Sequence, residues 1–358
     1  MNKKHLIWDL LLRKLNQRKN AKKLNFHTPN GIALERFIQI GGIDQWITIR
    51  GEDRNKPVLF FIHGGPASTY TVFSPLLRSW EKYFTIVQWD QRGAGKTFRR
   101  NGVNGSGEIT FDSLANDGLE VAEFLCKHLN QEKIILVGSS MGSFIGVMMV
   151  KRRPDLFHAY VGTDQNVGPD PDHLSYQMTL EGLRAAGNKK GVQAIERIGS
   201  DPLKWSRKDF DERNRWIIKS TTTVPNMIMD IMLPAILSSP GHTIRDIIDI
   251  FKGMNYSLDL LFDELMTFDI RNLGLEFDIP FFIFQGDTDS MTPTALAQAY
   301  FDDIRAPFKE IVLIHNAGHL AAFARTEQFL DELRMRLSPL VDSASKKDDI
   351  SLHLVKPI

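Results

Sequence analysis

The sequence predicts an α/β fold in which a mostly parallel sheet is covered by helices on both faces. Three observations predict it. Short runs of apolar, β-branched and aromatic residues alternate with stretches of helical spacing. Several of these runs are apolar throughout, as in strands that are buried on both faces. The runs also end in turns rich in glycine, serine or aspartate, and strands that alternate with helices favour parallel pairing.

The elements of the first half follow in chain order. Residues 35–40 and 45–50 flank Gly41-Gly42 and predict an opening hairpin. The remaining expected elements are strands over 57–63, 84–90 and 133–139, helices over 112–129 and 140–150, and a further strand over 159–162.

The alternation stops after residue 162 and resumes near residue 280, with strands expected over 280–287 and 309–315 and helices over 294–301 and 326–337. We interpret 163–272 as an inserted helical cap on a core formed by 25–162 and 273–340, with a tail over 341–358. The cap is rich in methionine, which we expect to pack inside it because methionine fills irregular gaps. The methionines are Met178, Met227, Met229, Met232, Met254 and Met266.

Residues 1–24 are strongly basic. They hold eight Lys or Arg against a single acid, Asp9, which gives +7, whereas the rest of the chain carries −6. Leu6, Leu10, Leu11 and Leu15 fall on one side of a helix, so we expect a basic amphipathic leader. It either touches an anionic membrane surface or a partner, or docks on its own domain.

Composition excludes several classes. The 358 residues are 42% hydrophobic with a net charge of +1, which argues against disorder and against nucleic-acid binding by the body of the chain. The single cysteine, Cys126, excludes an internal disulfide framework. No apolar run reaches the roughly 20 residues of a membrane-spanning helix. We therefore expect a cytoplasmic globular protein, at most peripheral at a membrane.

The strongest chemical signal is Gly138-Ser139-Ser140-Met141-Gly142, a match to G-x-S-x-G between an expected strand and an expected helix. This pattern describes a sharp strand-to-helix turn that exposes the central side chain above the sheet. Ser140 is therefore the candidate nucleophile. A serine hydroxyl needs a neighbouring base to accept its proton.

His319 is the candidate base, because it follows the strand over 309–315 and the carboxyl ends of parallel strands meet at one edge. An acid must then orient the imidazole. Asp287 and Asp289 both follow the strand over 280–287. We favour Asp289, which lies deeper in its loop, and interpret Asp287 as a strand-end or turn residue.

Two backbone N–H groups are candidates for an oxyanion hole. One belongs to Met141, directly after the nucleophile and at the start of a helix. The other belongs to Gly65 in His63-Gly64-Gly65-Pro66, after the strand over 57–63. The nucleophile, acid and base occur in the chain order of the α/β-hydrolase fold.

Five segments together, IHGGP, WDQRGAGK, GSSMG, GDTD and NAGH, resemble the prolyl iminopeptidase branch of the α/β hydrolases, over about residues 35–160 and 275–340. The resemblance implies the triad Ser140, Asp289 and His319, and an oxyanion hole in the HGGP loop. It also implies a bracing role for Asp90 and Arg92. The chain departs from the pattern at Ala67 and at Lys96-Thr97.

The expected reaction is acyl transfer through a serine acyl-enzyme, without a metal or an organic cofactor. Two substrate classes stay open: short peptides cleaved by an aminopeptidase, or apolar esters cleaved by a carboxylesterase or lactonase. The resemblance implies that carboxylates of the cap hold a peptide's amino terminus; Glu181, Asp230 and Glu264 are possible here, and no motif singles out one of them. A protein of another class, a non-catalytic receptor or scaffold on the same fold, is a further alternative.

Overall fold

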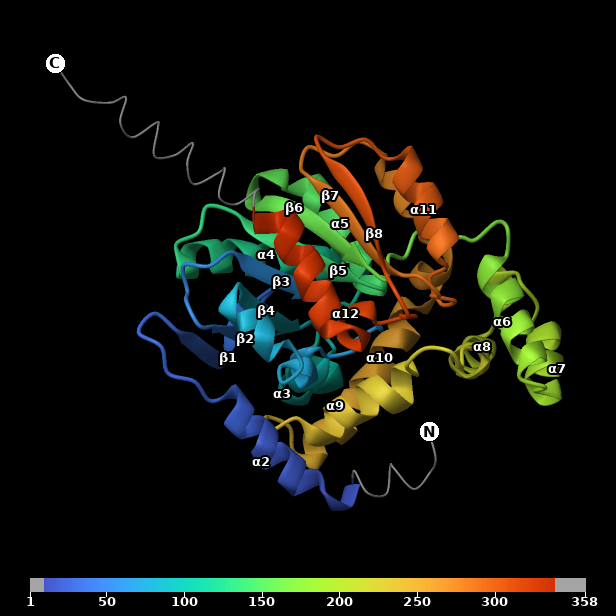
Figure 1. The fold of residues 1–358 in the computed structure, drawn as a ribbon, viewed down its shortest axis with the longest axis horizontal. Coiled ribbons are helices and arrows are strands. Elements are labelled where there is room, and N and C mark those ends of the chain that lie inside the picture. Colours follow the sequence, from blue (N-terminus) through green and yellow to red (C-terminus); the bar gives the residue numbers. More distant parts are fainter. Residues whose placement is uncertain (1–9, 339–358) are drawn as a thin grey trace.

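The computed structural model describes residues 10–338. Its centre is an eight-stranded sheet with the order β1-β2-β4-β3-β5-β6-β7-β8 (Figure 1). The β1–β2 and β2–β4 pairs are antiparallel, and all later pairs are parallel. The strands are β1 (Ile32–Ile40), β2 (Ile43–Gly51), β3 (Val58–Ile62), β4 (Thr85–Asp90), β5 (Ile134–Ser139), β6 (Phe157–Thr163), β7 (Phe281–Gly286) and β8 (Lys309–Ile314).

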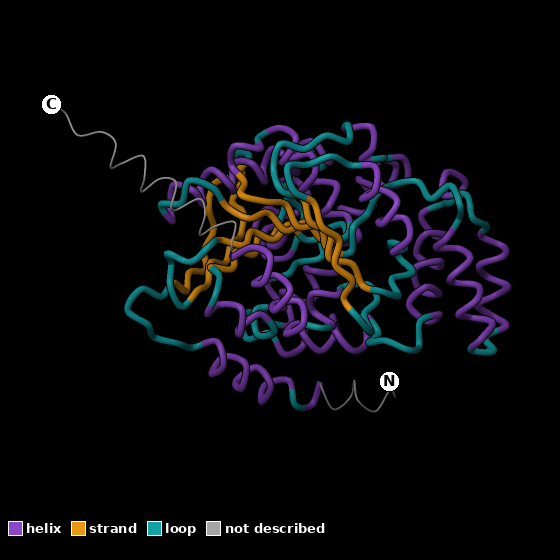
Figure 2. The backbone as a smooth tube through the Cα atoms, turned by 45° about the horizontal axis from the view of Figure 1, so that its top comes forward, coloured by secondary structure: helices purple, strands orange, loops and turns teal. Residues whose placement is uncertain are grey.

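Helices enclose this twisted sheet, as Figure 2 shows. The α-helices are α2 (Arg13–Leu24), α3 (Gly95–Gly105), α4 (Phe111–Leu129), α5 (Met141–Arg152), α6 (Leu174–Ala185), α7 (Lys189–Ile198), α8 (Arg207–Ser220), α9 (Leu233–Ser238), α10 (Ile244–Thr267), α11 (Thr294–Asp303) and α12 (Ala321–Ala324). Residues 326–338 are also helical. The shorter helical segments are the π-helix η5 (Met227–Met232) and the 3₁₀ helices η1 (Thr71–Phe73), η2 (Leu77–Lys82), η3 (Pro154–Leu156), η4 (Pro202–Lys204) and η6 (Ile270–Leu273).

The predicted α/β fold is confirmed, and each predicted strand and helix outside the leader is present with its ends shifted by a few residues at most. Helix α3 was not predicted. Its sequence, GKTFRRNGVNG, contains three glycines, and one of them, Gly102, has a φ of 65° that interrupts the helix. Glycine disfavours helices, so helical spacing alone does not reveal this element.

Two apolar cores hold the sheet, one on each face. Trp89, Phe144 and Tyr160 belong to the first core, together with residues of α4 and α5. Trp80 and Phe329 belong to the second, where their rings stack with centroids 5.6 Å apart. Because the central strands are buried on both faces, their carboxyl ends and the loops that follow are held at fixed positions.

The chain between β6 and β7 is helical and contains α6 to α10. Helices α6, α7 and α8 lie together at one end of the molecule (Figure 1). A small apolar core of their own, which includes Leu180, Leu183 and Ile195, holds them together. The helical content agrees with the prediction for this interval, while its separation as a cap over 163–272 stays a prediction.

Helix α2 of the predicted leader runs beside α9 (Figure 1). Leu6 lies outside the described residues, and Leu10, Leu11 and Leu15 are 54%, 70% and 61% exposed. The predicted apolar side therefore does not face the protein. Polar side chains attach the helix instead, and they donate to backbone carbonyls: Arg13 to His242 at 2.7 Å, Gln17 to Ser239 at 2.7 Å, and Asn20 to Ser238 at 3.1 Å.

Candidate active site

Ser140 occupies the turn from β5 to α5 and has φ 53° and ψ −127°. A positive φ is strained for a residue with a side chain, and it persists because the surrounding chain fixes the turn. The flanking glycines permit this. A Cβ on Gly142 would lie 2.3 Å from the carbonyl oxygen of Ile62, and one on Gly138 would lie 2.9 Å from the Tyr160 hydroxyl. The turn therefore packs directly against β3 and β6.

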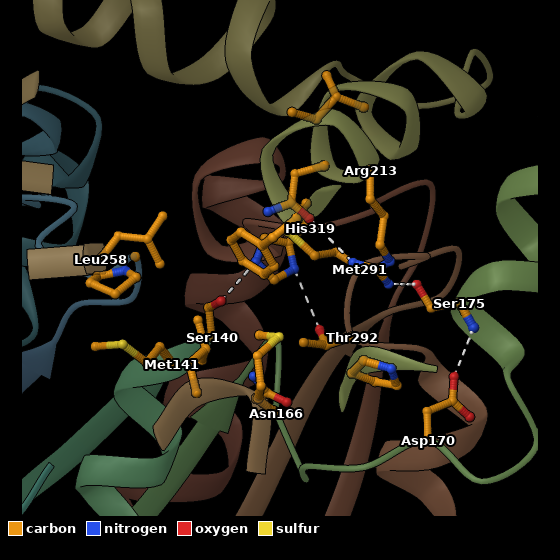
Figure 3. A pocket seen from close by; sticks show the side chains of 18 of the residues that line it. Ser140, Met141, Asn166, Asp170, Ser175, Arg213, Leu258, Met291, Thr292 and His319 are labelled. Atoms are coloured by element: carbon orange, nitrogen blue, oxygen red, sulfur yellow. Dashed lines mark hydrogen bonds between the residues drawn. The ribbon is translucent and has the colours of Figure 1, made fainter. Parts of the chain in front are cut away.

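Three predicted residues, Ser140, His319 and Asp289, lie in one hydrogen-bonded row (Figure 3 shows the first two). His319 Nε2 lies 3.0 Å from Ser140 Oγ, and His319 Nδ1 lies 2.8 Å from Asp289 Oδ2. The Asp289 side chain is fully buried and that of His319 is 8% exposed. With the proton on Nδ1 beside the carboxylate, Nε2 can accept the proton of the serine hydroxyl.

The loop after β7 holds the Asp289 carboxylate in place. The N–H groups of Met291 and Thr292 donate to its Oδ1 at 2.8 and 3.0 Å, and the Thr292 hydroxyl donates to Oδ2 at 2.8 Å. Asp287 lies elsewhere and accepts the N–H of Asn316 at 3.1 Å. Asp287 therefore connects the loop after β7 to the loop that carries His319, and this contact agrees with its interpretation as a residue at the end of a strand.

A second carboxylate that the sequence analysis did not single out lies beside this row. Asp164 directly follows β6, and its carboxylate, that of Asp289 and the ring of His319 each offer an atom within 4.8 Å of the others. Asp164 accepts the N–H of Ala321 at 3.0 Å and the hydroxyl of Ser139 at 3.2 Å. Because Asp164 follows the carboxyl end of a parallel strand, it lies at the same edge of the sheet as the loops after β5, β7 and β8.

Burial and charge act in opposite directions on these groups. Burial lowers the pKa of His319. The charge and hydrogen bond of Asp289 and the charge of Asp164 outweigh this effect and raise the pKa to about 9. Burial raises the pKa of the Asp164 carboxyl to about 6, against the lowering effect of the His319 charge. The two carboxylates therefore favour the imidazolium form of His319.

The residues of the two predicted oxyanion donors line the same cavity as Ser140. Met141 is the first residue of α5, so its N–H has no carbonyl one turn earlier within the helix. Gly65 follows Gly64, where a Cβ would lie 2.7 Å from the Ser140 Cβ. Only a glycine-containing loop can approach the serine this closely, which explains the HGGP sequence after β3.

Gln91, directly after β4, supports the Gly64-Gly65 turn through hydrogen bonds to His63. The Gln91 N–H donates to His63 Nε2 at 3.2 Å, and the Gln91 amide donates to the His63 carbonyl at 3.0 Å. Burial lowers the pKa of His63 to about 4, so its ring is neutral at pH 7 and can accept.

The bracing role expected for Asp90 and Arg92 agrees with their contacts. Asp90 Oδ2 accepts the N–H of Lys96 at 2.8 Å. Arg92 forms a buried bidentate pair with Asp117, at 2.9 and 3.0 Å, and donates to the Ser106 carbonyl at 2.8 Å.

A cavity of about 390 Å³ opens beside Ser140, and the helical segment between β6 and β7 forms much of its wall. Four of the six methionines that were expected to pack inside this segment line the cavity, together with Met141 and Met291. These four are Met227, Met232, Met254 and Met266. The interpretation of the methionines as interior packing was therefore incomplete, because a cavity wall has the same composition as a core.

The three acids considered as amino-terminus partners do not line this cavity. Glu181 is exposed, Asp230 accepts the N–H of Asn226, and Glu264 accepts the N–H of Phe111. The polar side chains that do line it include Asn166, Asp170, Ser175 and Arg213, which Figure 3 shows around the site. No sequence motif marks these residues. Asn166 alone had a usable signal, since it follows the end of β6.

Among residues 10–338, no helix is both long enough and apolar enough to cross a bilayer.

Comparisons with known proteins agree with this geometry. The family model for the alpha/beta hydrolase fold matches residues 57–326. The Bacillus subtilis (strain 168) protein named "Probable aminopeptidase YbaC" is 27% identical over 308 residues, which cover 84% of this chain and 95% of that protein. The proline iminopeptidase of Clostridioides difficile (strain 630) is 30% identical over 129 residues, 36% of this chain and 42% of that protein.

A solved structure supports the same fold. The proline iminopeptidase-related protein of Thermus thermophilus has a TM-score of 0.58 at 17% identity, covering 87% of this chain and 99% of that one. The match to the family model and the names of these relatives identify a serine hydrolase, so the alternative of a non-catalytic receptor is set aside. The chain belongs to the α/β-hydrolase family.

Proposed function

We propose that the protein cleaves its substrate through an acyl-enzyme on Ser140, with His319 as general base and acid and Asp289 as the orienting carboxylate. The observation that carries this proposal is the hydrogen-bonded row from Asp289 Oδ2 through His319 to Ser140 Oγ, at 2.8 and 3.0 Å. A base within hydrogen-bond reach of the hydroxyl, itself held by an acid, is what an activated serine requires.

In the proposed reaction, His319 Nε2 takes the proton of the Ser140 hydroxyl as Oγ attacks the carbonyl carbon. The N–H groups of Gly65 and Met141 donate to the oxyanion, and the imidazolium then protonates the leaving group as its bond to the acyl carbon breaks. Water, deprotonated by His319, attacks the acyl-enzyme and releases the acid and the free Ser140 hydroxyl. Removing one such oxyanion donor typically costs 10²- to 10³-fold in kcat.

We propose an aminopeptidase that acts on short peptides with proline or another small residue at the amino terminus. The names of the relatives support it: the Bacillus subtilis relative spans most of this chain and is named as an aminopeptidase. A carboxylesterase or lactonase is the second candidate. Its support is the wall of the cavity, where methionines and Leu258 offer an apolar surface to an acyl chain.

An active-site probe and a substrate panel test this proposal. A fluorophosphonate should label the wild type and not Ser140→Ala, while Ser139→Ala, whose hydroxyl faces Tyr70 and Asp164, should still be labelled. Equal labelling of wild type and Ser140→Ala would remove the nucleophile. Proline nitroanilide and short nitrophenyl esters are then compared. Turnover of the esters alone favours the esterase over the aminopeptidase.

We also propose that helix α2 contacts an anionic membrane surface. Leu10, Leu11 and Leu15 are exposed, and the cations beside them are exposed as well. These cations are Lys14, Arg18, Lys19 and Lys22. Exposed leucines among cations suit the boundary between lipid headgroups and acyl chains.

Vesicle sedimentation of the full chain tests the membrane contact. Anionic vesicles should retain the wild type more than neutral vesicles do, and the triple variant Lys14→Glu, Arg18→Glu, Lys19→Glu should lose the difference. The control, Lys189→Glu with Lys190→Glu, reverses two exposed charges on α7 and should keep it. If wild type and triple variant bind anionic vesicles equally, the contact is rejected.

A further inference from the structure

Arg213 of helix α8 places a positive charge in the wall of the cavity that contains Ser140. The neighbouring wall is largely apolar. In Figure 3 the guanidinium lies on the far side of His319 and Met291 from Ser140. A charged side chain in an apolar, half-buried setting requires compensation by neighbouring groups.

The protein positions Arg213 without neutralising it. Its Nη2 donates to the Ser175 hydroxyl at 2.6 Å, its Nη1 donates to the Asn214 side-chain oxygen at 3.2 Å, and the guanidinium lies 4.6 Å from the centre of the Trp205 ring. No carboxylate of residues 10–338 forms an ion pair with it. Burial lowers the pKa of Arg213 to about 10, with the charge of Asp170 opposing this, so it is cationic at neutral pH.

Two acids, Asp170 and Asp211, line the same cavity, and neither forms an ion pair with Arg213. Asp170 accepts the N–H of Ser175 at 2.9 Å through Oδ2, while its buried Oδ1 has no hydrogen-bond partner among residues 10–338. Asp211 pairs with Arg207, one turn before it on the same helix. A guanidinium has five N–H donors in a planar fork, and two of those of Arg213 are used. Three donors therefore have no acceptor among residues 10–338.

We propose that Arg213 binds a carboxylate of the substrate, at the end of the cavity remote from the carbonyl that Ser140 attacks. The substrate would then be a short, largely apolar molecule with the scissile bond near one end and a free carboxylate at the other. The planar fork suits a carboxylate, which can accept two parallel N–H donors. This inference rests on the proposed function, since Ser140 defines the other end of the substrate.

Two sources of that carboxylate are possible, and each corresponds to one of the candidate functions. In an aminopeptidase substrate it is the carboxyl terminus of a di- or tripeptide. In an esterase substrate it is the second carboxyl group of a dicarboxylic half-ester. The test therefore uses one matched pair of each kind: prolyl-leucine with prolyl-leucinamide, and mono-p-nitrophenyl adipate with its methyl ester.

A structural role for Arg213 is the competing explanation, because its contact Ser175 donates in turn to the carbonyl of Ser290, next to Asp289. Loss of that connection would impair acid and neutral substrates alike. Loss of a carboxylate contact would impair the acid substrate alone and would act mainly through KM. The ratio of the two kcat/KM values therefore separates the two roles.

The experiment measures kcat and KM of the full chain for each pair, with Arg213→Gln, Arg213→Lys and the control Arg215→Gln, an exposed arginine on the same helix. Wild type should prefer the acid member of the pair it cleaves. Arg213→Gln should reduce kcat/KM for that acid by roughly 10- to 100-fold, with Arg213→Lys between, and should leave the neutral member within about twofold. Equal losses on both members, or a wild-type preference for the neutral member, would overturn the inference.

A second measurement distinguishes failure of the carboxylate site from failure of the proposed function. Hexanoate should slow fluorophosphonate labelling of Ser140 in the wild type more than hexanamide does, and Arg213→Gln should abolish the difference. Equal protection by the two compounds in the wild type counts against the carboxylate site even where neither pair is hydrolysed. Labelling that survives Ser140→Ala sinks the proposed function instead. Arg213→Lys provides the comparison if Arg213→Gln does not fold.

Discussion

Asp164 should control the pH at which the enzyme becomes active. In the proposed mechanism His319 must be neutral to accept the serine proton, and the neighbouring carboxylates raise its pKa to about 9. We therefore expect kcat/KM to rise with pH along a limb whose midpoint lies near that value. Asp164, whose pKa is about 6, is ionised over this limb. Replacing it by asparagine removes a negative charge that favours the imidazolium, so the limb should move to lower pH.

The size of the shift follows from the geometry. The carboxylate of Asp164 has an oxygen within 4.8 Å of a ring nitrogen of His319. At this separation two unit charges interact by about 0.9 kcal/mol in a water-like dielectric and by about 3.5 kcal/mol at an effective dielectric constant of 20. One pKa unit corresponds to about 1.4 kcal/mol. The midpoint should therefore fall by between about 0.6 and 2.5 pH units.

The assay is kcat/KM against pH, from about pH 6 to pH 10.5, on whichever substrate the panel identifies. Asp164→Asn can still accept the N–H of Ala321, which is the backbone contact of the native side chain. Asp172→Asn is the control, because Asp172 is an exposed acid in the same loop after β6. In Asp172→Asn, the midpoint of the kcat/KM limb should equal that of the wild type. A midpoint in Asp164→Asn that equals this value, or lies at higher pH, would refute the electrostatic explanation.

Two further predictions concern the frame around the site. Gly142→Ala should reduce both activity and melting temperature, because its Cβ would lie 2.3 Å from the Ile62 carbonyl oxygen; Gly241→Ala, whose Cβ would meet nothing closer than 3.8 Å, should change neither in parallel assays. Arg92→Ala should lower the free energy of unfolding by roughly 3–5 kcal/mol in urea titrations, because it leaves the buried Asp117 carboxylate without its cationic partner. The exposed Arg100→Ala should cost less than about 1 kcal/mol, and equal losses would contradict the argument from burial.

The fold and the grouping of Ser140, His319 and Asp289 could be predicted from the sequence because both depend on local signals. The Ser140 turn is encoded by glycines at fixed spacing, and the choice of Asp289 over Asp287 followed from position within one short loop. The carboxyl ends of parallel strands then bring the loops after β5, β7 and β8 together. Chain order alone was therefore enough to predict which distant residues meet.

The substrate-binding half of the site could not be reached in this way. Arg213 and Ser175 come from helices α8 and α6, whose arrangement depends on packing between segments far apart in the chain. Glu181 and Glu264 had the right chemistry, yet one faces solvent and the other accepts a backbone N–H. Helical periodicity tells which side of a helix is apolar, but not which cavity or surface that side meets. For the same reason, helical periodicity did not show that the leucines of the leader would face away from the protein.

The attachment of helix α2 has a consequence for how freely this protein can vary. Arg13, Gln17 and Asn20 all donate to main-chain oxygens at the end of α9 and just beyond it. Every amino acid supplies such an oxygen. Substitutions at Ser238 or Ser239 that keep the backbone in place therefore preserve the acceptors. An apolar residue in place of a donor on α2 would instead remove the hydrogen bond. Tolerance to mutation at this contact is one-sided, and homologues that retain the helix should vary more on the α9 side than on the α2 side.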